Sequence, residues 1–241
     1  AVDAQDLIKK IKRNSHAMAE TDVRYYLNGM LFEFEDSHLN LVAMDGHRMV
    51  IDKVETDHQG LDNQSIVPRN GIEVIRKVFG KVKGQLIISV YSNHLIIEHG
   101  DTTAILQLID GSYVNYRQVV PDKFSSDFKV NVAGMLREIN KLTFDKDEPI
   151  SYVMLQGKKE YVEIYNSRTP EAKTKLYPTF RESFKMDTFD MMFNVEYLKE
   201  AFKTLTTENV LVSEASGQRM ISMQEGNFRV MVMGVKPANK I

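Results

Sequence analysis

The chain has 241 residues, which is long for one ordinary domain and comfortable for two of about 120 residues each. Its 43% hydrophobic and 27% charged residues exclude a disordered chain, and its longest apolar runs are far shorter than the roughly 20 residues of a membrane-spanning helix. A net charge of −2 argues against nucleic-acid affinity spread over the whole surface, so any such affinity must be local.

The first half of the sequence predicts a helix, a hairpin, a second helix and three strands. Residues 4–19 place apolar side chains on one face and basic ones elsewhere, as an amphipathic helix does. Residues 29–45 alternate apolar and polar around a turn, which predicts a β-hairpin. Residues 68–83 again have helical spacing, and Gly84 marks their end. Three short strands follow, at 86–90, 94–99 and 103–108.

The second half repeats this order of elements. A helix is predicted around 135–142, a hairpin at 152–165, a second helix at 195–205 and three strands between 210 and 235. Matching strands lie roughly 124 positions apart, so we interpret the chain as a duplicated unit. The fold class expected is α+β, with two repeated domains at 1–121 and 122–241, each placing two helices on one side and antiparallel sheets on the other.

Basic residues concentrate on the two predicted helices of the first half. Residues 1–19 and 69–83 together hold nine basic and three acidic side chains, although the whole chain is acidic. A positive helix face on an acidic protein is typical of a surface that meets phosphates. A solvated helix face is the alternative that charge alone leaves open. In the second half the basic residues are interleaved with glutamates, and the pattern is weaker.

The sequence predicts no catalytic chemistry. The glycine-rich nucleotide motifs and the serine-hydrolase motif G-x-S-x-G are absent, and the chain has no cysteine, which favours a cytoplasmic location. On an alternating strand His94 and Glu98 face one way and His99 the other, so they do not converge on a metal. Glu33 and Glu35 are interpreted as the solvated face of a strand. We therefore expect no enzymatic activity, no cofactor and no metal.

Residues 22–29 bring a cation and two aromatic side chains together ahead of a strand. Arg24, Tyr25 and Tyr26 are suited to phosphate contact and base stacking on single-stranded nucleic acid. Half-buried strand tyrosines are an equally open interpretation. The Asp45-Gly46 pair that follows is explained by a hairpin turn alone.

The last predicted strand carries Met231, Met233 and Val235 on one face. Core packing is the default interpretation of such a stripe. Methionine also suits surfaces that accept several apolar peptides, because its unbranched thioether repacks easily.

Five segments together resemble a known family. They are DVRYYLNGMLFE (22–33), MDGHRM (44–49), IVPR (66–69), LIDGSYVNYRQVVP (108–121) and FNVEYL (193–198). The sequence resembles the middle and C-terminal domains of the bacterial DNA polymerase III beta subunit, the sliding clamp. The first of the family's three domains is expected to be missing, which agrees with a start that lacks Met and looks like the end of a strand.

The resemblance implies a ring around duplex DNA. In the family three similar domains per chain close as a head-to-tail dimer, with sheets outside and helices lining the hole, and contacts to phosphates hold DNA without reading its sequence. We expect a replication processivity factor that is a homo-oligomer, cytoplasmic and associated with the nucleoid, with no membrane partner. The residues expected to face DNA are Lys10, Lys12, Arg13, Arg24, Tyr25, Tyr26, Arg69, Arg76, Lys77, Arg137, Lys199 and Lys203.

The resemblance also implies an apolar cleft between the two domains. In the family it accepts short peptides of DNA polymerases, the clamp loader and repair proteins such as ligase. The residues expected to line it are Leu27, Met44, Gly46, His47, Arg48, Met49, Val114, Gln118, Val119, Met231, Met233, Val235 and Lys236.

The sequence departs from the family at three places. Val114 and Gln118 stand where the family usually has Pro and Arg, and residues 142–148 replace a stretch that usually closes the ring. Gly234 replaces a proline and is expected to loosen the last strand, and residues 237–241 form an additional tail that could cover the cleft. A two-domain partner-binding module that does not encircle DNA is therefore the alternative function.

Overall fold

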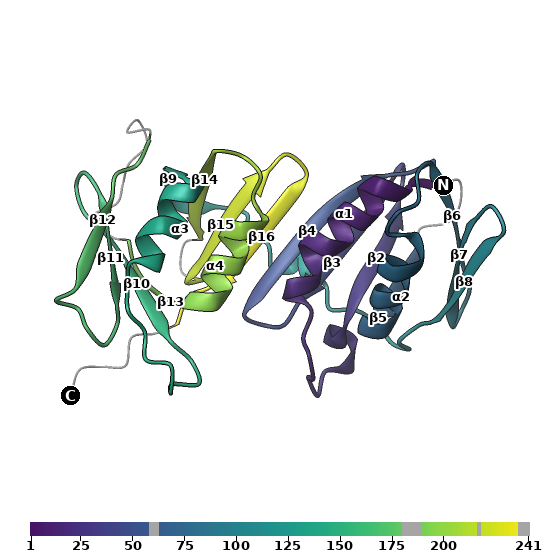
Figure 1. The fold of residues 1–241 in the computed structure, drawn as a ribbon, viewed down its shortest axis with the longest axis horizontal. Helices are drawn as coiled ribbons and strands as arrows, with labels where there is room; N and C mark the ends of the chain where they lie inside the picture. Colours follow the sequence, from purple (N-terminus) through teal and green to yellow (C-terminus); the bar gives the residue numbers. More distant parts are fainter. Residues whose placement is uncertain (58–62, 180–188, 216–217, 236–241) are drawn as a thin grey trace. The chain divides into compact units, whose positions relative to one another are not determined.

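The computed structural model describes residues 1–57, 63–179, 189–215 and 218–235, with the side chains of 125 and 126 left out (Figure 1). The chain divides into two compact units, Ala1–Val119 and Val120–Ile241. The sequence places the domain boundary after Pro121, close to this division. None of the described helices combines the length and the hydropathy needed to cross a membrane.

Over its described residues, 1–57 and 63–119, the first unit has eight strands in two antiparallel groups of four, and two α-helices. One sheet has the strand order β5-β2-β3-β4 and the other β1-β6-β7-β8. Three short 3₁₀ turns, η1 (Ser15–Ala17), η2 (Tyr25–Asn28) and η3 (Tyr116–Gln118), join or follow these elements. The elements are β1 (Val2–Asp3), α1 (Ala4–Asn14), β2 (Gly29–Glu35), β3 (His38–Met44), β4 (Arg48–Glu55), β5 (Asn63–Pro68), α2 (Arg69–Phe79), β6 (Gln85–Val90), β7 (His94–His99) and β8 (Thr102–Gln107).

The second unit has the same order of elements and the same sheet topology. Its sheets are β13-β10-β11-β12 and β9-β14-β15-β16, which correspond strand for strand to those of the first unit. The duplicated unit and the α+β fold class predicted from the sequence are thereby confirmed. The elements are β9 (Phe124–Asn131), α3 (Val132–Asn140), β10 (Tyr152–Gly157), β11 (Val162–Asn166), β12 (Lys173–Leu176), β13 (Asp190–Asn194), α4 (Val195–Thr204), β14 (Asn209–Ala215), β15 (Met220–Glu225) and β16 (Phe228–Met233).

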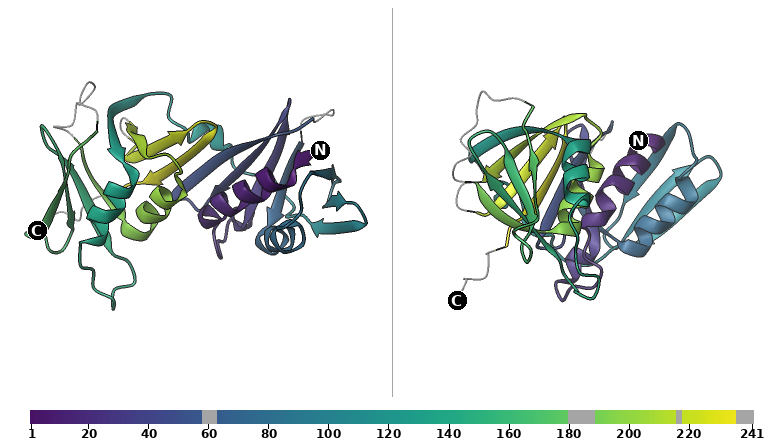
Figure 2. Two further views of the ribbon diagram at one scale, coloured as in Figure 1. Left: turned by 45° about the horizontal axis from the view of Figure 1, so that its top comes forward. Right: turned by 60° about the vertical axis from the view of Figure 1, so that its left-hand side comes forward.

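In each unit the two helices pack against each other and against the strands. α1 contacts α2 and α3 contacts α4, and Figure 2 shows α1 and α2 side by side against the strands of their unit. Each helix follows a strand directly, and three begin at a side-chain cap: Asp3, Asn131 and Asn194 accept backbone N–H groups of the first turn. The apolar stripes are buried, as the helical spacing predicts, with Leu7, Ile11, Ile72, Ile75 and Phe79 inside the first unit and Met135, Ile139, Leu198 and Phe202 inside the second.

The structure corrects several predicted elements. The first helix ends at Asn14 and continues only as the 3₁₀ turn η1, and the second covers Arg69–Phe79. The strands β4 and β5, and their counterparts β12 and β13 in the second unit, were not predicted from the sequence. β4 lacks a clean alternation because Asp52 is buried in it, and β5 runs without a loop into α2, so the turn residues that would separate the two are missing. β9 occupies part of 121–130, which the sequence predicts to be the connection between domains.

Candidate nucleic-acid and partner-binding surfaces

Some basic residues of α1 face solvent, and others are half-buried. Lys12 is exposed. Lys10 is half-buried, and its Nζ donates to Asp6 Oδ2 at 2.8 Å and to the carbonyl of Lys53. Arg13 is also half-buried. Burial raises the pKa of the Asp52 carboxyl, and the positive charges of Lys10 and Arg13 offset this rise only in part. Of the three α1 cations expected to face DNA, Lys10 and Arg13 thus act on a carboxylate inside the unit.

The basic residues of α2 also differ in their exposure to solvent. Arg76 and Lys77 are exposed, and Lys77 Nζ lies 3.9 Å from the exposed carboxylate of Glu73, a separation at which an ion pair contributes little. Arg69 instead turns back into the unit, where its Nη2 donates to the carbonyls of Met18 and Ala19 at 2.8 and 3.0 Å. Arg69 therefore holds the segment after η1, and Arg76 and Lys77 present their charge to solvent.

In the second unit Arg137 and Lys203 are exposed, and Lys199 is not. The Lys199 side chain is largely covered, its Nζ lies 3.3 Å from Glu196 Oε1, and it stands 5.6 Å from the centre of the Phe144 ring. Arg137 lies 3.4 Å from the buried carboxylate of Glu138. The cationic face of this unit is accordingly weaker, as the interleaved glutamates predict.

The segment with Arg24 and the turn at Gly46 lie next to each other. Arg24 donates from Nε and Nη2 to the two carboxylate oxygens of Asp22, at 3.0 and 2.8 Å, and these hydrogen bonds lower the pKa of Asp22 to about 2. Gly46 has φ +88°, and a Cβ there would stand 2.9 Å from Arg24 Nη2. Gly46 is thus favoured by its left-handed conformation, and the flexible end of the Arg24 side chain lies against it.

The sequence leaves open whether Tyr25 and Tyr26 are accessible to bases or half-buried, and the structure shows one of each. Tyr25 is exposed, and Tyr26 is half-buried and packs edge-to-face against Tyr25 and Tyr113 at ring distances of 6.1 and 6.2 Å. Of the two tyrosines, only Tyr25, at 56% exposure, is accessible enough for a base to stack on it.

The residues of the first unit that the resemblance assigns to the peptide cleft have very different exposures. Leu27 is 1% exposed, and Met44 and Met49 are also buried, so these side chains belong to the core. The remaining residues present at least part of their surface: Gly46, His47 and Gln118 are exposed, and Arg48, Val114 and Val119 are intermediate. Asp45 shapes the turn, because its carboxylate accepts the N–H groups of His47 and Arg48 and an ion pair from Arg48 Nε.

The cleft residues of the second unit lie on β16 and just beyond it. Met231 is fully buried, Met233 is half-buried and Val235 is 38% exposed, while Lys236 and residues 237–241 fall outside the described part of the chain. Gly234 does not loosen the strand, contrary to the expectation. Its N–H donates to the carbonyl of Arg219, the next N–H donates to Met192, and a Cβ at Gly234 would stand 2.8 Å from Met191 Cε.

A buried carboxylate on β2 is the feature that the sequence interpretation missed. Glu33 is 5% exposed and not part of a solvated face. It accepts two hydrogen bonds from Arg117 at 2.9 and 2.8 Å, and others from Tyr116, Gln64 and Asn40. These bonds tie η3 to the sheet. The sequence does not distinguish this glutamate from a solvated one, because its partners Gln64, Tyr116 and Arg117 lie 31 to 84 residues away.

The histidines considered as metal ligands serve other contacts. The His94 ring stacks on Tyr91 with a centroid distance of 4.6 Å, and His99 Nδ1 lies 3.0 Å from the Gln85 carbonyl. Among the residues that the structure describes, no three His, Cys, Asp or Glu side chains gather in a way that could hold a metal ion.

Comparison with known proteins shows the family. Residues 1–115 match the model of the DNA polymerase III beta subunit, central domain. The chain is 30% identical to the beta sliding clamp of Pseudomonas putida, over 94% of this chain and 62% of that protein. The DNA polymerase III subunit beta of Pseudomonas aeruginosa, 25% identical, shares the fold with a TM-score of 0.84 over 98% of this chain and 67% of that one. The chain belongs to the DNA polymerase III beta subunit family.

The family match places the exposed cations of α2, the Arg24 segment and the Gly46 turn on a beta-clamp central domain. A second clamp structure, the Helicobacter pylori beta clamp bound to a DNA ligase peptide, is 19% identical and shares the fold with a TM-score of 0.81 over 98% of this chain and 64% of that one. The chain spans 62% of the Pseudomonas putida clamp and 55% of the Proteus mirabilis clamp.

Proposed function

We propose that this chain acts in DNA replication as a sliding clamp, a processivity factor that encircles duplex DNA without enzymatic activity of its own. The observation that carries the proposal is the repeated clamp unit, in which both helices pack on one side of the sheets and expose cations. Such a ring retains DNA by topology, so its contacts need only be weak and sensitive to salt. We place the protein in the bacterial cytoplasm at the nucleoid, with no cofactor.

The exposed members of the predicted DNA-facing set are the ones suited to touch phosphates. They are Lys12, Arg24, Arg76, Lys77, Arg137 and Lys203, with Tyr25 as an exposed aromatic neighbour. Lys10, Arg13, Arg69 and Lys199 support this surface from within, because each is at least half covered. Lysine and arginine contacts to the backbone fix position without selecting sequence, which agrees with a clamp that slides.

The partner-peptide residues are proposed to bind short apolar peptides of polymerase, clamp loader and repair proteins. The name of the Helicobacter pylori structure, a clamp bound to a DNA ligase peptide, supports this class of partner. Met233, Val235, Val114 and Val119 offer partly exposed apolar surface, with His47 and Gln118 as polar neighbours. Burying one or two aliphatic or aromatic anchors at about 1.5–3 kcal/mol each supports affinity on the order of micromolar.

Polymerase processivity on primed circular DNA tests the clamp proposal. With a cognate clamp loader and ATP, the chain should lengthen the products made in one binding event, and linearising the circle should release it. A variant with Lys12, Arg76 and Lys77 changed to Gln should lose part of this effect. Products of unchanged length with the wild-type chain would contradict the proposal.

A partner-binding module that does not encircle DNA is the second candidate. It is favoured by the small number of exposed cations in the second unit, where Arg137 and Lys203 remain from the predicted set. Binding of a ligase-derived peptide together with no retention on circular DNA would establish this alternative.

A further inference from the structure

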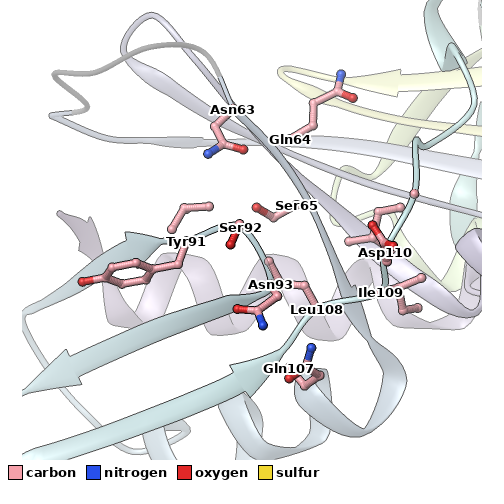
Figure 3. Close-up of a pocket in the computed structure, with 13 residues that line it drawn as sticks. Asn63, Gln64, Ser65, Tyr91, Ser92, Asn93, Gln107, Leu108, Ile109 and Asp110 are labelled. Carbon is pink, nitrogen blue, oxygen red and sulfur yellow. The ribbon is translucent and has the colours of Figure 1, made fainter.

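A polar pocket lies in the first unit, where its lining residue Gly111 borders Tyr25 of the Arg24 segment. Its volume is about 540 Å³, and it is lined by β5, the end of β6 with the turn that follows it, and the end of β8 with residues 108–111. In Figure 3, Asn63 and Ser65 lie across this space from Tyr91, Ser92 and Asn93, while the Gln64 side chain points away from them. None of the predicted DNA-facing or peptide-cleft residues lines it.

The pocket contains a buried hydroxyl without a partner. Ser65 is 3% exposed, and its Oγ makes no hydrogen bond to any described group. Buried polar side-chain atoms are nearly always hydrogen-bonded in folded proteins, so an orphan hydroxyl in a pocket wall points to a ligand that completes it. A hydroxyl can both donate and accept, and it therefore does not by itself fix the ligand's polarity.

Only part of the β5 edge beside the Ser65 hydroxyl is hydrogen-bonded to other backbone groups. Ile109 donates its N–H to the carbonyl of Ile66 at 2.9 Å, so the backbone groups of Ile66 point away from β2. In an antiparallel ladder this direction recurs every second residue, which makes Gln64 present its N–H and C=O on the same edge. No described backbone group pairs with them, because the chain turns away at Gly111, whose φ is +126°.

The side chains of the pocket exclude an anionic ligand. No Lys or Arg is among the lining residues, and Asp110 supplies a negative charge. Asn63, Asn93 and Gln107 contribute amides, and Tyr91, stacked on His94, contributes a flat wall. Amides, a hydroxyl and an open strand edge match the donors and acceptors of a neutral polypeptide backbone.

We propose that this pocket binds an extended, uncharged peptide segment, which adds to β5 at Gln64 and places a hydrogen-bonding side chain against Ser65. The backbone of the bound residue donates to and accepts from Gln64, continuing the pairing that Ile109 begins at Ile66. The peptide's Ser, Thr, Asn or Gln side chain satisfies Ser65 Oγ. This interaction is independent of DNA binding and of the peptide-cleft residues.

Proline at position 64 provides the sharpest test. Because the Gln64 N–H points away from β2, Gln64→Pro removes the donor offered to the ligand and keeps the ladder with β2. Gln64→Ala is the matched control, since it removes only the side chain and its bond to Glu33. The probe is the capped peptide acetyl-Thr-Val-Asn-Val-Thr-amide, titrated into ¹⁵N-labelled protein.

We expect the amide signals of Gln64, Ser65 and Asn93 to shift on titration. Gln64→Pro and Ser65→Ala should each bind about fivefold more weakly than wild type, the effect of one hydrogen bond, while Gln64→Ala stays within twofold. Two probe analogues, N-methylated at adjacent residues, should differ, because only alternate N–H groups face β5. This comparison uses wild-type protein and holds even where Gln64→Pro does not fold.

No shift at millimolar peptide would overturn the proposal. Equal binding by Gln64→Pro and Gln64→Ala, or equal binding by the two N-methylated analogues, would overturn strand addition as well.

Discussion

Glu33 connects three parts of the first unit through one carboxylate. Its hydrogen bonds reach Gln64 on β5, Asn40 on β3 and both Tyr116 and Arg117 in η3. Burial raises the pKa of Glu33, but the hydrogen bonds from Arg117, Tyr116 and Gln64 outweigh burial and lower it to about 2. The charged form is therefore the one that the fold stabilises.

This arrangement predicts how Glu33 responds to acid. Since the folded pKa lies below the ordinary value, the stabilisation is complete above about pH 5 and is lost as the pH falls toward 2. Glu33→Gln should lower the free energy of unfolding by about 2–3 kcal/mol at pH 7 and by less at pH 3. Urea unfolding at both pH values measures the difference. Glu35→Gln, at a half-exposed neighbour, is the control, and an equal loss at pH 7 and pH 3 would contradict the prediction.

The peptide-cleft residues separate into core and surface positions. Leu27 and Met231 are fully buried, so alanine there costs about 2–5 kcal/mol of stability. Met233 and Val235 are only partly covered and offer the better test.

Met233→Ala with Val235→Ala should weaken a ligase-derived peptide at least tenfold and change the thermal midpoint little. Fluorescence titration and thermal unfolding measure the two effects. Lys203→Ala, on α4, is the control and should alter neither. Unchanged peptide affinity in the double variant would exclude these two residues from the peptide site.

At the level of elements, helical periodicity predicted the helices better than alternation predicted the strands. The stripe Ile72, Ile75 and Phe79 is buried as expected, because a helix brings residues three and four apart to one face. β4 was not predicted because a charged residue, Asp52, is buried in it and interrupts the alternation of apolar and polar residues. The charges of Lys10 and Arg13 on α1 act on this carboxyl. This interaction joins residues about 40 positions apart, so it leaves no signal in the local sequence pattern.

The same interaction shows why counting basic residues on a helix does not predict which of them face solvent. Both Lys10 and Arg13 lie on a basic helix, yet their charges act on a buried carboxylate, while Lys12 between them is exposed. Arg69 is likewise occupied by the carbonyls of Met18 and Ala19. The sequence identified the basic helices, but the division between inward and outward cations required the tertiary structure.

Exposed and covered cations should therefore differ in DNA binding. Changing Lys12, Arg76 and Lys77 to Gln should lower the salt slope of duplex binding by up to about 3, because each lost phosphate contact removes close to one released counterion. Lys10→Gln should leave the slope unchanged and lower stability. Fluorescence anisotropy from low to moderate salt measures both. A slope that falls equally in the two variants would contradict this division.

At the scale of the whole molecule, each unit has a sheet that ends in an edge strand. β8 ends the sheet β1-β6-β7-β8, and β12 ends the sheet β13-β10-β11-β12. β12 carries the exposed lysines Lys173 and Lys175, a usual protection of a sheet edge, whereas β8 carries Ile105 at 68% exposure. An exposed isoleucine on an edge strand favours pairing with another chain.

Native mass spectrometry distinguishes a ring from a separate module. Since each chain of 27.7 kDa has two units, a ring of six units needs three copies, about 83 kDa. We expect this trimer at micromolar concentration, and we expect Ile105→Lys to convert it to a monomer, because a charge on an edge strand opposes pairing. Ile87→Lys, on the interior strand β6 of the same sheet, is the control and should remain trimeric. A wild-type monomer would contradict ring closure by this chain alone and favour the partner-binding module. A trimer that resists Ile105→Lys would show that β8 is not the edge through which the copies meet.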